Sequence, residues 1–217
     1  MLKMKKKEKT SNQKNRIETI LKMAISASLG SLGIVLSTIV VFVPNFELIS
    51  VTIFLISLLF GVYYGLLAAI SISLVYEFII TLIVGPAPYL FPFKLICYII
   101  LALIAGLTRK FFLRLSFWEL GILGSLFALI YDVFVTIGFV TIGSNKLIMS
   151  ILLAAIVNGT LLTIIHVIGN FILFSLTKTI LNWILAAFKV RGLKQLMLPN
   201  VTTVKEMSLM NSDEVDK

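Results

Sequence analysis

The chain has 217 residues, of which 59% are apolar and only 13% are charged. This composition lies far outside the range of soluble globular domains and is typical of an integral membrane protein. The formal net charge is +9. Because the positive charge is concentrated in a few segments between apolar runs, we interpret it as a topology signal and expect no nucleic-acid partner.

Six apolar runs follow one another along the chain, over residues 20–43, 48–60, 66–84, 93–107, 120–142 and 147–188. Short turns separate them, one of them at 61–65, so they predict an all-α protein made of one compact bundle of six transmembrane helices. The last run is too long for one perpendicular span of about 20 residues, which predicts an extended or bent helix.

Basic residues gather in three places: before the first run, after the fourth and after the last. They are Lys3, Lys5, Lys6, Lys7, Lys9, Lys14, Arg16, Lys22, Arg109, Lys110, Arg114, Lys189, Arg191 and Lys194. A cytoplasmic excess of Lys and Arg orients spans, so both termini are expected in the cytoplasm of a multi-pass plasma-membrane protein. We divide the chain into a basic tail (1–19), a membrane domain (20–188) and a C-terminal tail (189–217). Residues 1–16 are expected to be disordered or to lie on anionic lipid.

The stretch 76–94 combines an acid, a proline-rich turn and a base. Glu77 lies inside the third run and Lys94 near the start of the fourth, with Gly85, Pro86, Pro88 and Pro92 between them. An ionisable group inside a span is costly and is a functional-site candidate, with a neutral carboxyl joining two helices as the alternative. Asp132, inside the fifth run, is a second such acid, and Lys94 is a possible ion-pair partner for either.

Several other residues are candidates for the wall of a ligand site near the outer turns. Asn45 and Glu47 lie in the first outer turn, and Asn158 either faces a cavity or bridges helices. Tyr89, Phe91 and Phe93 form either an aromatic belt or a stacking surface for a planar ligand. His166 is interpreted as a packing residue, Asn170 as a helix bridge and Cys97 as a core residue.

Motifs of catalysis are missing from the sequence. It has a single histidine and contains no HExxH, GxSxG or P-loop pattern. We therefore expect no enzyme activity, metal or cofactor, and any use of ATP must come from a partner.

The first run carries small residues at helical spacing, namely Ala24, Ala27, Ser28 and Ser31. This spacing permits close helix approach. It serves either packing inside the bundle or the docking of a partner, and spacing alone favours internal packing.

The order of features resembles the substrate-binding S components of energy-coupling factor (ECF) vitamin transporters. The resemblance covers 44–136 and is carried by PNFELISVTIFLISLLFGVYYGLLAAISISLVYEF, GPAPYLFPFKLICYIILALIAGL and LGILGSLFALIYDVF. The GPxP…PF turn, the AGL that ends the fourth run and the Gly-rich fifth run with its Asp are most similar to the cobalamin-type branch.

The resemblance implies a six-span protein that binds a vitamin from the outer side. It also implies association with a transmembrane coupling protein and two cytoplasmic ATPase subunits, whose ATP cycle would release the ligand inward. Family members dock through small residues on the first span, often Ala-x-x-x-Ala, which appears here only as Ala24-x-x-x-Ser28 or Ala27-x-x-x-Ser31. Two other hypotheses stay open: a membrane enzyme acting on lipid through Glu77, Asp132 and His166, and a stand-alone proton-coupled carrier.

Overall fold

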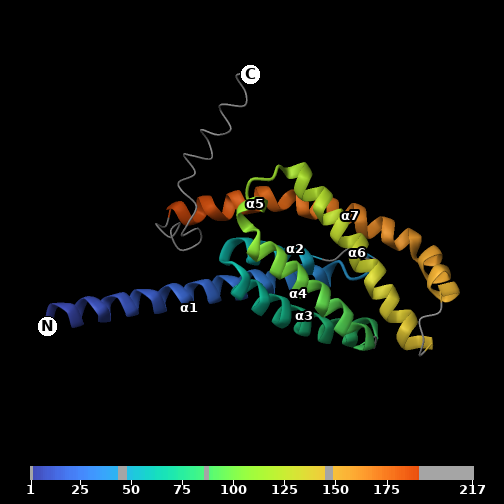
Figure 1. Cartoon of the computed structure of the whole chain (residues 1–217), viewed down its shortest axis with the longest axis horizontal. Coiled ribbons are helices and arrows are strands. Elements are labelled where there is room, and N and C mark those ends of the chain that lie inside the picture. The colour runs from blue at the N-terminus through green and yellow to red at the C-terminus, as the bar shows by residue number, and fades with distance from the viewer. Residues whose placement is uncertain (1, 44–47, 86–87, 145–148, 191–217) are drawn as a thin grey trace, which may run out of the picture.

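The computed structural model describes residues 2–43, 48–85, 88–144 and 149–190. Every regular element in these ranges is a helix (Figure 1). The α-helices are α1 (Leu2–Ile39), α2 (Ile49–Phe60), α3 (Val62–Val84), α4 (Phe91–Leu107), α5 (Arg109–Phe112), α6 (Phe117–Ser144) and α7 (Met149–Val190), and the 3-10 helix η1 (Pro88–Leu90) precedes α4. The predicted all-α class is confirmed.

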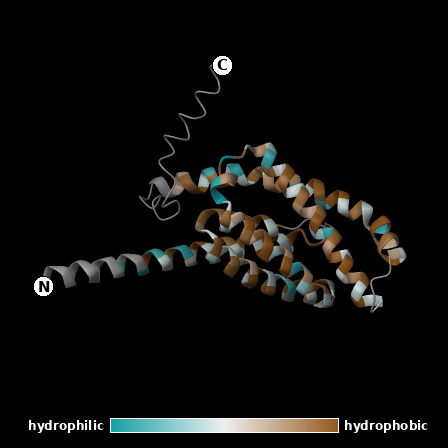
Figure 2. Ribbon diagram, in the orientation of Figure 1, coloured by the Kyte–Doolittle hydropathy of each residue, from teal (hydrophilic) through white to brown (hydrophobic). Residues whose placement is uncertain are grey.

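Four helical segments are long and apolar enough to cross a membrane: Arg16–Ile39, Val62–Ile83, Phe117–Ser144 and Met149–Ala187. The chain is therefore a helical membrane protein, and Figure 2 shows the hydrophobic residues along these helices. The apolar helices α2 and α4 have 12 and 17 residues. At 1.5 Å per residue they measure about 18 and 26 Å, less than a hydrocarbon core of about 30 Å. The number of six spans therefore stays a prediction.

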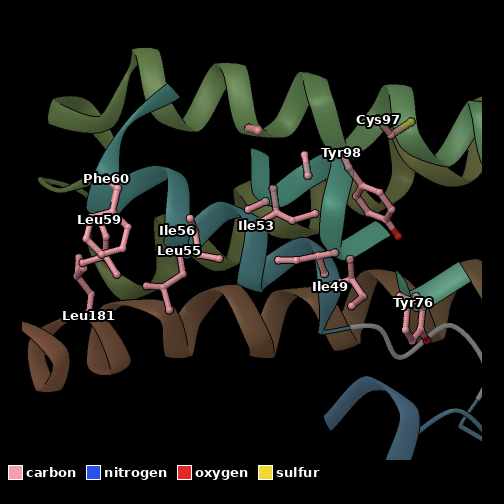
Figure 3. Packing of buried hydrophobic residues seen from close by; sticks show 14 of the residues in the cluster. Ile49, Ile53, Leu55, Ile56, Leu59, Phe60, Tyr76, Cys97, Tyr98 and Leu181 are labelled. Carbon is pink, nitrogen blue, oxygen red and sulfur yellow. The ribbon is translucent and has the colours of Figure 1, made fainter. Parts of the chain in front are cut away.

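Helix α2 is the core of the bundle, because the side chains of all its residues are buried. It packs against α1, α3, α4 and α7. Figure 3 shows its apolar residues between Tyr98 of α4 and Leu181 of α7. This segment can be buried on all sides because it carries no charged residue, and the hydroxyls of Thr52 and Ser57 donate to the carbonyl oxygens of Leu48 and Ile53.

The chain reverses between α2 and α3 at one residue, Gly61, whose φ is 88°. A side chain would strain the backbone there, so glycine suits this position. Helix α3 starts directly afterwards at Val62. The predicted turn over 61–65 is therefore wrong, since most of it belongs to the first turn of α3.

One end of the bundle, which we call the basic end, carries Arg109, Lys110, Arg114 and Lys178. Arg109 donates a hydrogen bond to the carbonyl oxygen of Leu59 at 2.9 Å, at the end of α2. Lys178 of α7 donates to the carbonyl oxygens of Leu113 and Leu115 at 2.7 and 2.9 Å. Burial lowers the pKa of the Arg109 guanidinium from its ordinary value.

Helix α1 begins and α7 ends toward the basic end, where α1 projects beyond the other helices (Figure 1). The backbone is helical from Leu2, so the expected disorder over 1–16 is wrong for 2–16. Residues 191–217, most of the predicted C-terminal tail, lie outside the described residues. The last predicted run agrees with α7, a single helix of 42 residues.

The opposite end of the bundle is formed without α2. The hydroxyl of Ser50, in the first turn of α2, donates to the Oδ1 atom of Asn170 at 3.2 Å, which places the start of α2 beside Asn170. Helix α7 continues from there for 21 residues to Met149. We call this end of the bundle the open end. It is formed by the C-terminal halves of α3 and α6 and by the N-terminal halves of α4 and α7.

Candidate functional site

An ion pair joins α3 to α4 near the open end. Lys94 Nζ lies 3.0 and 3.3 Å from the two carboxylate oxygens of Glu77. The two side chains are 12% and 19% exposed, for Glu77 and Lys94 respectively. Of the two acids proposed as partners of Lys94, the structure selects Glu77. Mutual pairing compensates much of the cost of placing each charge among apolar helices.

A second pair joins α6 to α7. His166 Nδ1 lies 2.8 Å from Asp132 Oδ1, and the side chains are 5% and 13% exposed. The second carboxylate oxygen of Asp132, Oδ2, is buried and has no hydrogen-bond partner among the described residues. An unpaired buried acceptor is costly and is often found at functional sites.

His166 is buried and hydrogen-bonded, as a packing residue is, and the enzyme hypothesis alone had grouped it with Asp132. Asp132 lies 12 residues before the last residue of α6, Ser144, whereas His166 lies 17 residues after the first residue of α7, Met149. The two residues are therefore not equally far from the segment that joins the helices, and their spacing alone does not predict the pair.

Polar contacts extend from the Asp132–His166 pair toward two neighbouring helices. Asn170 Nδ2 donates to the carbonyl oxygen of His166 at 3.1 Å, and its Oδ1 accepts from Ser50 of α2, so Asn170 bridges helices as expected. The ring of Tyr131 meets the His166 ring edge-on at 5.5 Å. The hydroxyls of Tyr131 and Tyr98 lie 3.3 Å apart, which connects α6 with α4.

The aromatic candidates occupy different surroundings. The Phe93 ring lies 5.6 Å from that of Phe134, and a Cβ atom added to Gly138 would lie 2.6 Å from Phe93. Phe93 therefore packs between α4 and α6. Phe91 is half-buried, and Tyr89 is 45% exposed. Exposed or half-buried aromatic rings fit both an interfacial belt and a stacking surface.

The remaining wall candidates are not brought to either pair. Asn158 is exposed on α7. Asn45 and Glu47 lie outside the described residues. Among the hydrogen bonds of the described residues, none joins the Glu77–Lys94 pair to the Asp132–His166 pair.

The small residues of the first run lie on a face of α1 that is exposed: Ala24, Ala27, Ser28 and Ser31. The packed face of α1 carries Gly30 and Gly33 instead, and a Cβ atom at Gly33 would clash with Thr52 of α2. The hypothesis that the four small residues serve packing inside the bundle is therefore wrong. Their face is available to lipid or to a partner.

The two pairs give the site its chemistry. A lysine and a carboxylate can exchange their mutual contact for the polar groups of a ligand, and a carboxylate beside an imidazole can hold or transfer a proton. Within the described ranges, no group of three His, Cys, Asp or Glu residues is arranged to hold a metal ion. Comparison of the chain with protein-family models, with curated proteins and with solved structures found no match.

Proposed function

We propose that the protein is the substrate-capture (S) subunit of an ECF-type ABC transporter that imports a vitamin, with cobalamin as the favoured ligand. The observation that carries the proposal is the presence of two pairs of ionisable side chains, Glu77–Lys94 and Asp132–His166, inside apolar helices away from the basic end. By the positive-inside rule, the basic end lies on the cytoplasmic side of the plasma membrane. The open end would then face outward.

Charged groups among membrane helices are costly and are usually retained for binding or transport. The partial exposure of Glu77 and Lys94 supports a binding role, because a ligand could reach them without unfolding a helix. An S subunit needs partners, namely a coupling transmembrane protein and two cytoplasmic ATPases. The exposed small-residue face of α1 offers a surface for the coupling protein, since small residues permit close helix approach.

Equilibrium binding to the purified protein tests this function. We expect submicromolar affinity for one member of a panel of cobalamin, riboflavin, thiamine, biotin, folate and queuine. Absence of binding across the panel by protein that remains folded would contradict the proposal.

A second candidate function rests on the Asp132–His166 pair, whose 2.8 Å separation meets the geometric requirement for acid–base work. It could serve a membrane enzyme acting on lipid or a proton-coupled carrier. Glu77, the third group of the enzyme hypothesis, is paired with Lys94 instead. Uptake driven by a pH gradient in vesicles without any ATPase, and lost in Asp132→Asn, would favour the carrier over the S subunit.

A further inference from the structure

The four cations of the basic end fall into two groups. Arg109 and Lys178 are half-buried and donate to backbone carbonyl oxygens, so they hold the fold together. Lys110 and Arg114 are exposed, and neither forms an ion pair with a carboxylate of the described residues. These two cations therefore have no partner within the described fold and are available to a partner outside it.

Helix α5 and the turn after it present these two cations on one side of the chain. On the inner side, Phe112 is buried and its ring meets that of Phe54 edge-on at 5.1 Å. On the outer side, Lys110, Phe111 and Arg114 are exposed. Residues four positions apart lie on the same face of a helical turn, which brings the two cations to the same side as the exposed Phe111 ring.

The start of α6 adds two more exposed rings to this side of the bundle. Phe117 and Trp118 are 42% and 62% exposed, and the indole ring lies 5.7 Å from the ring of Phe171 on α7. The backbone N–H and the hydroxyl of Ser116 donate to the Glu119 carboxylate at 2.7 and 2.8 Å, an arrangement that caps α6. The acid nearest to the two rings in the sequence is thus engaged by the cap.

The exposed residues form a surface that we call the interfacial patch: Lys110, Phe111, Arg114, Phe117 and Trp118. The apolar helix α4 ends just before the patch and the membrane-spanning α6 begins within it, so the patch lies where these helices leave the hydrocarbon layer. Aromatic rings favour this level of a bilayer. Ammonium and guanidinium groups form strong, charge-assisted hydrogen bonds with phosphate oxygens.

We propose that the interfacial patch binds an anionic phospholipid of the cytoplasmic leaflet, with Lys110 and Arg114 on the headgroup phosphate and the three rings against the upper acyl chains. The charges are complementary, because the cytoplasmic leaflet is the one rich in anionic lipids. Such a lipid also carries a phosphate and acyl chains in one molecule, as cations beside exposed rings require. The proposal needs the basic end to face the cytoplasm but does not depend on vitamin transport.

Tryptophan fluorescence tests the patch directly. The chain has two tryptophans, so Trp183→Phe leaves Trp118 as the only one. The protein is placed in vesicles of equal parts phosphatidylglycerol and phosphatidylcholine, in which one of the two lipids carries brominated chains that quench a nearby indole. We expect brominated phosphatidylglycerol to quench Trp118 at least about twofold more strongly than brominated phosphatidylcholine, because two cations attract the anionic lipid. High salt should reduce this preference, since exposed charges are screened. Equal quenching by the two lipids would overturn the proposal.

A double substitution shows whether the preference belongs to the two cations. Lys110→Gln/Arg114→Gln should abolish the preference at Trp118 and unfold at the temperature of the parent, since both side chains are exposed. Trp183, studied in a Trp118→Phe background, is the matched reporter, because it lies about 18 Å farther along α7 than Phe171. The double substitution should leave quenching of Trp183 unchanged. A preference kept at Trp118 in the folded double variant, or lost equally at Trp183, would overturn the assignment to these cations.

Discussion

The two ends of this bundle use charged residues in different ways. At the basic end, Arg109 and Lys178 donate to backbone carbonyl oxygens left free where helices end. Toward the open end, Lys94 and His166 contact carboxylates instead. Cations bound to backbone carbonyls hold the fold together, whereas side-chain pairs can exchange their partners for a ligand. Under the proposed function, one end of the bundle serves structure and the other serves binding.

The largest effect on stability is expected from breaking the more buried of the two side-chain pairs. His166→Ala leaves Asp132 without its hydrogen-bond partner among apolar helices, and removal of one member of a buried pair costs about 3–5 kcal/mol. Thermal unfolding in detergent micelles measures it. The double variant Asp132→Leu/His166→Ala should be more stable than His166→Ala alone, because the carboxyl group that lost its partner is removed as well. A single variant as stable as the parent would show that the pair is not energetically coupled to the fold.

A smaller loss of stability is expected at the basic end from Arg109→Met. The variant loses the hydrogen bond to the carbonyl oxygen of Leu59, and a hydrogen bond to a charged group contributes about 1.5–3 kcal/mol. Lys110→Met, at an exposed neighbouring position, is the matched control. Vitamin binding at a temperature where Arg109→Met remains folded should be unchanged. Weaker binding by the folded variant would remove the distinction between the two ends.

The smallest effect on stability is expected from Ala27→Leu on the exposed face of α1. Substitutions that touch no other helix usually change stability by less than about 0.5 kcal/mol. Gly33→Ala, on the packed face of the same helix, should cost about 1–3 kcal/mol because its Cβ atom would overlap Thr52.

Co-purification with a coupling protein should be lost in Ala27→Leu. Retention of the partner by this variant would exclude the exposed face as the docking surface.

Most of the fold could be predicted from apolar runs, because burial in lipid or in the core requires continuous hydrophobic helices. The extension of α1 to Leu2 could not be predicted in this way, since its Lys, Glu and Gln residues form helices readily but give no apolar run. The start of α3 at Val62 was missed because two glycines suggested a longer turn, although the backbone needs only one of them.

The candidate site was partly predictable for a related reason. Glu77 and Lys94 are separated by one short turn, so their proximity follows from the sequence. Asp132 and His166 lie 34 residues apart, and their pairing depends on the register of two long helices.

The central claim is that the two pairs of ionisable side chains away from the basic end belong to a ligand site. Its most direct test is the affinity of the parent and of Glu77→Ala for the tightest-binding vitamin of the panel. We predict that Glu77→Ala remains folded and binds at least tenfold more weakly, because Lys94 loses its partner and the ligand loses a polar contact. A folded Glu77→Ala protein that binds the vitamin as tightly as the parent would contradict the claim and leave the pair a structural link between α3 and α4.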